Sequence, residues 1–456
     1  MIIKSTIFAS AFSILLFEIP NDTLANHTQK QQTQNQSDIA ALFDRAAAKH
    51  RKELDNLLLS RAPSRIYLPS SQVSYKDVAE VLSENTNSNL FAGNEAIYPN
   101  KAAVLFYSYE QENLQVWLVD ANGIQAYHKR NISENQINTA ITKLRNSMGV
   151  DSLQLTRSPQ QRGIRVASRG QKSNLLNRSI AELTEILLPV DFTNKLASIK
   201  HLIIVPVLGL GTVPYAVLQP FGDGSFLIDR MSISVAPSLF DVGQSLERWD
   251  VSRAFSSPLI VGNPDLPISN EWIFPPLLGA EKEALAVAQA MNSTPLIGKQ
   301  ATKEMILSRV ATSSLLYFAT HGIASNNNPL SGSFLVLSAD QFERGLWTAK
   351  EVQETRAIAQ IAVLSACQTG LGKVHDAGII GLARAFQIAG IPRVVMSLWS
   401  VDDAATSELM QAFVEHLKQD NNISPAEALR KAMLEVRTQR PAPSQWASFV
   451  LFGTPR

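Results

Sequence analysis

Two polar residues, His321 and Cys367, each follow a short and strongly apolar run of the sequence. The runs are Leu315–Thr320 and Ile361–Ala366, and Cys367 is the only cysteine of the chain. Runs of this length that close in a glycine-containing turn are typical of buried strands in a parallel sheet. Ligands bind outside the carboxyl ends of such strands, so two adjacent strands would bring an imidazole beside a thiol. A thiol with a neighbouring base is the arrangement of a cysteine nucleophile.

The chemistry of a cysteine nucleophile needs three groups. A thiol attacks a carbonyl well only as the thiolate, so His321 must take its proton or hold the thiolate as an ion pair. The attacked carbonyl needs hydrogen-bond donors for its oxyanion, and Gly322 allows close backbone approach directly after the histidine. The N–H groups of Gly322 and Cys367 are therefore the expected donors, and Gly370 and Gly372 let the chain turn away from the nucleophile.

Other interpretations of these residues stay open on composition and spacing. Free cysteine is among the most buried residue types, and a histidine at a strand end is often only hydrogen-bonded. His375 is a rival base, although we expect it in a loop with no strand to fix its geometry.

The elements that position these residues belong to a globular chain of 456 residues, 45% hydrophobic and 18% charged. Such a length can bury two ordinary cores or one large one. With 41 basic and 40 acidic side chains the formal net charge is +1, so no overall field favours nucleic acid or an anionic membrane. A single cysteine excludes an intrachain disulfide framework, and no cysteine–histidine spacing indicates zinc. We expect no metal, no cofactor and no nucleic-acid partner.

The first 25 residues have the pattern of an export signal. Lys4 supplies a basic start, Ser5–Phe17 is an apolar run too short to span a bilayer, and Thr23–Ala25 is a tolerable cleavage site. We therefore expect cleavage near Ala25 and a periplasmic or extracellular protein. The alternatives are an uncleaved anchor or a misassigned start codon; if the signal is wrongly assigned, the protein is cytoplasmic. No later segment has the length and hydropathy of a transmembrane helix.

Residues 26–100 are predicted to be a linker and a helical N-terminal segment. The polar stretch 26–40 buries too little apolar surface to order itself, whereas 38–60 has the spacing of one amphipathic helix. A second, short helix is expected at 75–82. In the simpler interpretation the helix at 38–60 packs on the main domain; in the other it binds a protein partner.

Two further parts, residues 101–250 and 251–456, are predicted to follow. The first opens with strands, two of them joined across Asn122–Gly123, a strong hairpin signal, and its first helix has a capping box of Ser133 and Gln136. The second alternates strands with helices, which is typical of a parallel sheet covered on both faces. The predicted fold class is α/β, with a parallel-rich sheet preceded by a smaller mixed α+β subdomain and the N-terminal helical segment.

Four longer motifs resemble a known family. They are YFATHG at 317–322, VLSACQTGLG at 363–372, GIIGLARAFQIAGIPRVVMSLWSVDDAAT at 378–406 and WASFVLFG at 446–453. These motifs are similar to the CHAT domain, a caspase-like module often found with tetratricopeptide repeats. Shorter upstream matches extend the resemblance to roughly residues 100–456. Residues 208–215 depart from a segment that reads DGPLHYLPF in many members, and the sequence has no tetratricopeptide repeats.

The resemblance implies a caspase-hemoglobinase fold related to separases, in clan CD of the cysteine peptidases. It also implies a His/Cys dyad and peptide-bond hydrolysis, with Cys367 as nucleophile and His321 as general base and then acid. In related folds the strand after the nucleophile lines the pocket for P1, the residue before the cleaved bond. The candidate substrate-binding residues are therefore Gln368, Ser397, Trp399, Asp402 and Asp403.

Two aspartates of this set suggest a specificity. A carboxylate of Asp402 or Asp403 would favour Arg or Lys at P1 through a charge-assisted pair. The simpler interpretation for at least one of them is an N-cap of the helix that starts at Ala404. A basic loop at 157–172 offers exposed Arg and Lys bonds, as self-processing would require, although such loops are usually only solvated surface.

Three hypotheses follow from these residues. The first is a cysteine endopeptidase that acts on a protein or peptide substrate. The second is a non-catalytic CHAT-fold interaction or scaffold module, which binds a partner through its groove or through the helix at 38–60. The third is an unrelated thiol hydrolase or acyltransferase, which would share the reactive thiol and differ only in substrate.

Overall fold

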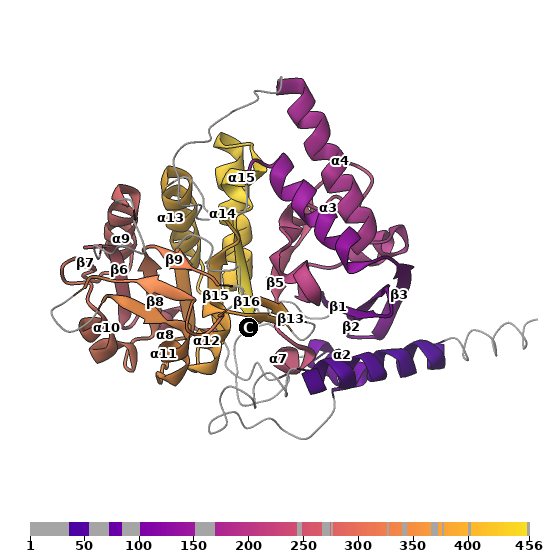
Figure 1. The fold of residues 1–456 in the computed structure, drawn as a ribbon, viewed down its shortest axis with the longest axis horizontal. Coiled ribbons are helices and arrows are strands. Elements are labelled where there is room, and N and C mark those ends of the chain that lie inside the picture. Colours follow the sequence, from indigo (N-terminus) through magenta and orange to yellow (C-terminus); the bar gives the residue numbers. More distant parts are fainter. Residues whose placement is uncertain are drawn as a thin grey trace, which may run out of the picture. The chain divides into compact units, whose positions relative to one another are not determined.

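An eleven-stranded, mostly parallel sheet forms the centre of the fold (Figure 1). The computed structural model describes residues 36–53, 73–83, 101–150, 169–243, 249–266, 274, 277–325, 328–339, 344–365, 373–375, 378–399 and 403–453. The chain divides into two units, Met1–Leu42 and Phe43–Arg456. In the first unit the described residues, 36–42, are helical, and the sheet belongs entirely to the second.

The strand order is β3-β2-β1-β4-β5-β16-β15-β12-β8-β6-β7. The bounds are β1 (Ala102–Glu110), β2 (Asn113–Asp120), β3 (Gly123–Asn131), β4 (His201–Val205), β5 (Ser232–Val235), β6 (Pro258–Pro264), β7 (Leu296–Gly298), β8 (Leu315–Ala319), β12 (Ile361–Ser365), β15 (Arg393–Ser397) and β16 (Phe449–Gly453). Three neighbouring pairs are antiparallel, namely β3/β2, β2/β1 and β16/β15, and the other pairs are parallel. Most strands are buried along their whole length because helices cover both faces.

The strand β16 joins the two halves of the sheet. It runs parallel to β5 on one side and antiparallel to β15 on the other. The strands from 101–250 and those from 251–456 therefore form one continuous sheet. In it β1, β4, β5 and β16 run one way, and β15, β12, β8, β6 and β7 run the opposite way. The division of the chain at that boundary stays a prediction.

Helices cover the two faces in separate groups. On one face lie α9 (Leu278–Ala290), α13 (Asp403–Gln419), α14 (Pro425–Gln439) and α15 (Pro443–Trp446), and on the other α11 (Ala349–Glu354) and α12 (Leu382–Ile388) (Figure 1). Rings of Phe318, Trp347 and Phe386 pack together under α12, with centroids 5.6–6.0 Å apart. The remaining helices are α2 (Tyr75–Ser83), α3 (Glu134–Ser147), α4 (Arg169–Leu187), α5 (Thr193–Leu196), α6 (Leu227–Arg230), α7 (Leu239–Gly243), α8 (Val251–Ala254) and α10 (Lys303–Val310), with short 3-10 turns η1 (Val190–Phe192), η2 (Leu208–Thr212) and η3 (Tyr215–Val217).

Two small sheets accompany the large one. One joins β11 (Leu346–Thr348), β10 (Phe334–Val336) and β9 (Gly322–Ile323), and the other joins β13 (Lys373–His375) with β14 (Gly378–Ile380). The sequence pattern did not predict them, because strands of two or three residues are too short to display a period.

Several local predictions are confirmed. The mixed α/β fold with a large parallel-rich sheet is present, and β2 and β3 form the predicted hairpin across Asn122–Gly123. Both bonds of the capping box at Ser133 and Gln136 are made. The predicted helix at 38–60 is observed over 36–53, and its remainder lies outside the described residues.

The helical residues 43–53 pack on β1 and β2, as in the simpler interpretation of this segment. The ring of Phe43 is buried, with its centroid 5.2 Å from that of Phe106 and 5.8 Å from that of Trp117. A partner role for this helix stays a prediction and could use only its exposed side.

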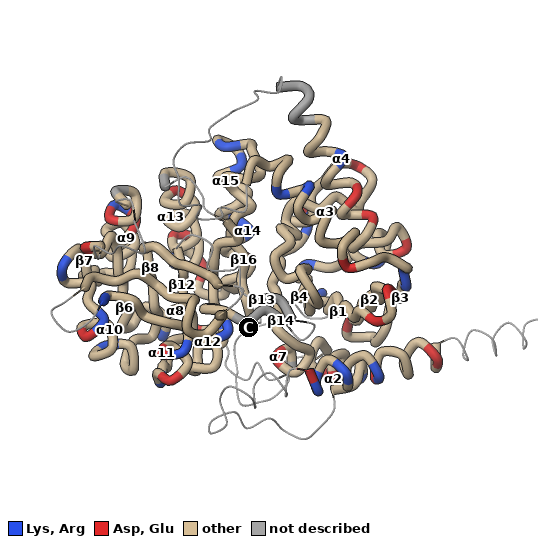
Figure 2. The backbone as a smooth tube through the Cα atoms, in the orientation of Figure 1, with Lys and Arg blue, Asp and Glu red and all other residues tan. Residues whose placement is uncertain are grey.

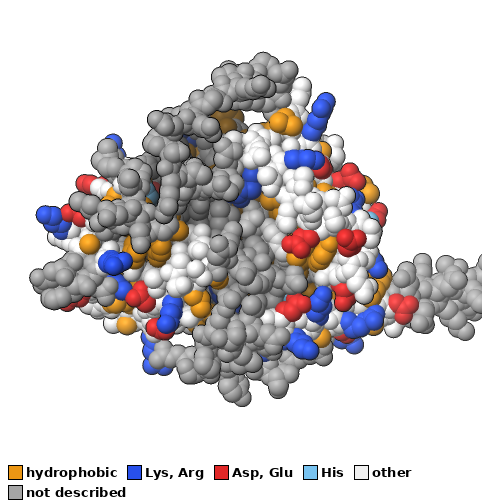
Figure 3. Space-filling view, in the orientation of Figure 1, with side chains coloured by type: hydrophobic (Ala, Val, Ile, Leu, Met, Phe, Trp, Pro, Cys, Tyr) orange, Lys and Arg blue, Asp and Glu red, His pale blue; other side chains and the backbone are white. Residues whose placement is uncertain are grey.

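Charges of both signs are interspersed over the elements (Figure 2) and over the face drawn in Figure 3. Among the helices that the structure describes, none combines the length and the hydropathy needed to cross a membrane.

A buried histidine in β4 makes stability depend on pH. His201 is fully buried, and its two ring nitrogens are hydrogen-bonded to the hydroxyls of Ser232 and Ser234, each at 3.0 Å. Burial lowers the pKa of His201 from 6.5 to about 3. Below about pH 6.5 the unfolded chain therefore binds a proton at His201 that the folded chain does not bind. The contribution of His201 to the free energy of unfolding is complete above about pH 6.5 and is lost as the pH falls towards about 3.

We expect the free energy of unfolding to fall by roughly 2 kcal/mol between pH 7 and pH 5 from this group. Urea unfolding at several pH values measures it. His201→Leu removes the titration, so its profile should be flatter in this window, even though the variant starts from a lower stability. Parallel profiles for the two proteins would contradict the prediction.

Candidate active site

The ends of three neighbouring strands form the candidate site. In the parallel register Ala319 of β8 stands opposite Ser365 of β12, and Leu364 of β12 stands opposite Met396 of β15, one residue before Ser397. His321 lies two residues beyond Ala319. Cys367 follows Ser365 by the same number of residues in the sequence, but it lies outside the described residues, as does Gln368.

His321 is held by its backbone and covered by an aromatic ring. His321 is only 8% exposed, and its carbonyl oxygen accepts a hydrogen bond from the N–H of Val336 at 2.9 Å. The hydroxyl of Thr320 donates to the carbonyl of the same Val336. The ring centroid of Phe274 lies 5.3 Å from that of His321 at an interplanar angle of 33°. These contacts fix where the strand end directs the imidazole.

Gly322 is positioned to offer its N–H. It stands opposite Leu335 in the β9/β10 pair, while the bond between Val336 and His321 shows that the neighbouring pair is the hydrogen-bonded one. Pairs alternate along an antiparallel ladder, so the Gly322/Leu335 pair exchanges no hydrogen bonds and the N–H of Gly322 points away from β10. That orientation leaves the N–H next to His321 directed away from the small sheet, as an oxyanion donor at this position would need.

A buried polar pair lies beneath the strand ends. The hydroxyl of Tyr317 in β8 donates to Oε1 of Glu283 in α9 at 2.6 Å, and both residues are buried. Burial and the Glu283 carboxylate hold the pKa of Tyr317 well above its usual value. The hydroxyl of Ser365 lies near enough to lower that pKa, yet its buried oxygen forms no hydrogen bond within the described part of the chain.

The candidate residues after β15 are enclosed in the structure. Ser397 and Trp399 are 2% and 1% exposed. The indole N–H of Trp399 donates to the carbonyl of Ser444 at 3.0 Å, so its polar group is already engaged. Asp402 lies outside the described residues, and Asp403 opens α13 with only its backbone described. Their roles stay predictions.

The expectation that His375 lies in a loop is wrong. It ends β13, where it pairs with Gly378 of β14. A strand of three residues is too short to show a period in the sequence, so the pattern did not predict it. Its side chain is not described, so its value as a rival base is decided by mutation.

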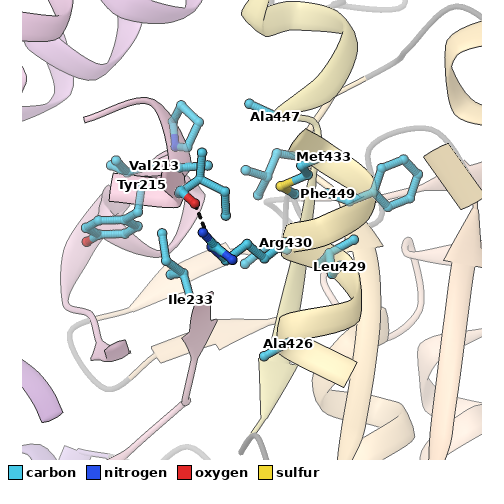
Figure 4. Close-up of a pocket in the computed structure, with 14 residues that line it drawn as sticks. Val213, Tyr215, Ile233, Ala426, Leu429, Arg430, Met433, Ala447 and Phe449 are labelled. Atoms are coloured by element: carbon cyan, nitrogen blue, oxygen red, sulfur yellow. Dashed lines mark hydrogen bonds between the residues drawn. The ribbon is translucent and has the colours of Figure 1, made fainter. Parts of the chain in front are cut away.

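A small cavity lies beside the residue that follows β15, since Leu398 is one of the residues that line it. It has a volume of about 20 Å³, enough for one water molecule, and is lined by residues such as Val213, Met433 and Phe449 (Figure 4). Arg430 in its wall donates to the backbone carbonyls of Ile228 and Asp229 at 2.8 and 2.7 Å. A cavity of this size cannot hold a peptide. In the described ranges no group of three or more His, Cys, Asp or Glu could hold a metal ion.

Sequence patterns had missed Phe274, Glu283, Tyr317 and a buried arginine, Arg145, which contacts the residues after β15. Tyr317 lies in β8 itself, and the other three reach the site through contacts between distant parts of the chain. The only local signal was polar residues in otherwise apolar elements, as with the tyrosine inside the run 315–319.

Comparison with known proteins identifies the family. The CHAT domain matches residues 177–454 of the sequence. The chain belongs to the CHAT domain family. The strands β1–β3 precede the matched residues, yet they extend the same sheet as the strands of the CHAT domain.

Relatives of the CHAT domain include Tetratricopeptide repeat protein 28 of Homo sapiens, 28% identical over 297 residues, and its counterpart in Mus musculus, 26% identical. The match covers 56% of this chain but 12% of each relative.

The solved structure of separase with securin from Saccharomyces cerevisiae is similar with a TM-score of 0.56 and 12% identity, over 91% of this chain and 34% of separase. The Arg-specific cysteine proteinase gingipain R has a TM-score of 0.41 and 12% identity, over 62% of this chain and 68% of gingipain. The likeness to separase shows that the chain has a caspase-like fold.

Proposed function

We propose that the protein is a cysteine endopeptidase in which Cys367 is the nucleophile and His321 the general base. The observation that carries the proposal is the parallel register of β8 and β12, which brings the ends of the histidine strand and the cysteine strand to neighbouring positions on one sheet edge. The orientation of the N–H of Gly322, which points away from β10, also supports the proposal. A panel of fluorogenic peptides, cut by wild type and by variants of the dyad, tests it.

Each step of the reaction has an assigned group. Sγ of Cys367 bonds to the peptide carbonyl carbon while the thiol proton passes to His321, and the N–H groups of Gly322 and Cys367 hold the oxyanion. His321 then gives the proton to the leaving amine as the C–N bond breaks, which leaves a thioester. Water attacks the thioester, its proton passes to His321 and then to Sγ, and the carboxylic acid leaves. This chemistry requires no metal or cofactor.

Specificity for a basic P1 residue is the finer part of the proposal, and it depends on a carboxylate from Asp402 or Asp403. Peptides with Arg or Lys at P1 should be cut about 10- to 100-fold faster than matched peptides with Asp, since a charge-assisted hydrogen bond contributes roughly 1.5–3 kcal/mol. The ratio of kcat/KM values for the two peptides measures it. Faster cleavage after Asp would exclude this specificity.

Two related proposals concern processing and export. If the loop 157–172 is cut by the enzyme itself, wild type should lose intact mass on incubation while Cys367→Ala keeps it; an active enzyme that stays whole excludes self-processing under those conditions.

We also propose export guided by the first 25 residues. Fractionation and N-terminal sequencing should then find a mature chain that starts near residue 26, and a cytoplasmic chain beginning at Met1 would contradict export.

A second candidate function is a non-catalytic module that binds a protein partner. Its support is the ring of Phe274 against His321 and the low exposure of that histidine, which would also suit a purely structural residue. Thiol reactivity separates the candidates. An activated Cys367 should alkylate rapidly, with a pH profile shifted below that of free cysteine, and an ordinary profile would favour the module.

A further inference from the structure

A buried guanidinium lies against the residues that follow β15. Arg145, in the last turn of α3, is 8% exposed, and its Nη2 donates to the carbonyl of Leu398 at 3.1 Å. Its Cζ stands 5.8 Å from the ring centroid of Trp399. Its Nη1 is buried and has no acceptor in the described structure, and burial lowers the pKa of the guanidinium.

The side chain of Arg145 makes its hydrogen bond and its ring contact with one segment of the chain, Leu398 and Trp399. A buried arginine is ordinarily paired with a carboxylate, because removing its charge from water is costly. Here no carboxylate of the described residues pairs with Arg145; its hydrogen bond and its ring contact both go to Leu398 and Trp399, more than 250 positions further along the chain. Holding these two residues is the role that its contacts explain.

The same two residues are fastened from the other side as well. The N–H of Leu398 donates to the carbonyl of Ser448 at 2.7 Å, and the indole of Trp399 donates to Ser444 at 3.0 Å. Elements from both halves of the sheet therefore hold this segment. A guanidinium suits the task better than an ammonium, because its plane can face an indole while its edge donates a hydrogen bond.

The position of this segment gives it a part in the site. Trp399 lies two residues beyond Ser397, the last residue of β15. His321 lies two residues beyond Ala319, the last residue of β8, and β12 pairs in parallel with both of these strands. Leu398 and Trp399 thus border the site on the side of β15. We propose that Arg145 is a positioning residue that fixes this border and thereby sets which P1 side chains are accepted. The part concerning P1 rests on the proposed endopeptidase function.

Hydrogen exchange tests the positioning without any need for catalysis. In Arg145→Met, amides of the segment around Leu398 and Trp399 should exchange at least about tenfold faster than in wild type, whereas those of β12 should be unchanged. Arg230→Met is the control, because Arg230 also faces a ring, that of Phe221, but its side chain bonds to Asp223 and Ser225 and not to Leu398. Unchanged exchange in a folded Arg145→Met would overturn the proposal.

Peptide selectivity tests the consequence for substrate. In Arg145→Met the preference between two P1 residues should fall about tenfold, mainly through KM, while alkylation of Cys367 by iodoacetamide stays within about twofold of wild type. Arg145→Lys, which keeps a donor but loses the planar contact, should restore part of the preference. An equal loss for every peptide, or slower alkylation in proportion, would assign Arg145 a general structural role and overturn the proposal.

Two safeguards keep the outcome decisive. If Arg145→Met does not fold, Trp399→Phe removes the bond to Ser444 from the same segment and should produce the same faster exchange and weaker selectivity; wild-type behaviour there would overturn the proposal. If wild type cuts no peptide in the panel, the endopeptidase function fails, and hydrogen exchange alone then decides whether Arg145 positions the segment.

Discussion

Replacing Cys367 by alanine is expected to lower peptide turnover at least about a thousandfold, because the variant has no atom that can form the thioester. His321→Ala should lower kcat by roughly a hundred- to ten-thousandfold, since the thiol then keeps its proton at neutral pH and the leaving amine receives none. Initial rates on the fluorogenic panel measure both effects. The folded state of each variant is checked by its urea midpoint.

Histidine controls make this result specific. His416→Ala removes a surface imidazole that lies 2.9 Å from Glu435 at the far end of α13, and should leave turnover unchanged. His375→Ala tests the rival base directly. If His375→Ala abolishes turnover and His321→Ala does not, the dyad is wrongly assigned; equal turnover by wild type, Cys367→Ala and His321→Ala would exclude the peptidase altogether.

Gly453→Ala is expected to lower the free energy of unfolding by about 3–5 kcal/mol. Gly453 ends β16 with φ +118°, a backbone conformation that residues with a side chain rarely adopt. A Cβ there would lie 2.2 Å from the carbonyl oxygen of Pro392, which is backbone and cannot rotate aside. Strain and overlap therefore add at one position, and urea unfolding measures their sum.

A second glycine separates the two costs. Gly149 also has a positive φ, +75°, but a Cβ there would meet no atom within 4 Å. Gly149→Ala should therefore cost only about 1 kcal/mol, from the backbone conformation alone. Similar losses in the two variants would show that the contact with Pro392 relaxes, and would contradict the larger prediction.

The residues of the candidate site that were predicted from the sequence share one property: the pattern that indicates each of them lies in the residues next to it. The runs before His321 and Cys367 are apolar because β8 and β12 are buried on both faces, so their type and their ends could be predicted without knowledge of any partner. The glycine after His321 was informative for the same reason. The family resemblance then supplied the order of the motifs.

Other parts depend on contacts that leave no local signal. Phe274 reaches His321, and Arg145 reaches Leu398, across long stretches of chain. No sequence pattern singled out Arg145, since spacing within a helix says nothing of what lies beyond it. The place of β16 is similar: the apolar run at 448–451 is typical of a strand, but its pairing with both β5 and β15 is a property of the whole sheet.

The central place of β16 has a consequence for biosynthesis. Every other strand of the large sheet precedes it in the sequence, so the ribosome delivers it after all of them. The residues between β15 and β16 take roughly 3–10 s to translate at about 5–20 residues per second. During that interval β5 and β15 expose unpaired edges that could join the strands of another nascent chain. A weakened β16 should therefore appear in cells first as aggregation and chaperone dependence, before any change in the properties of the folded protein.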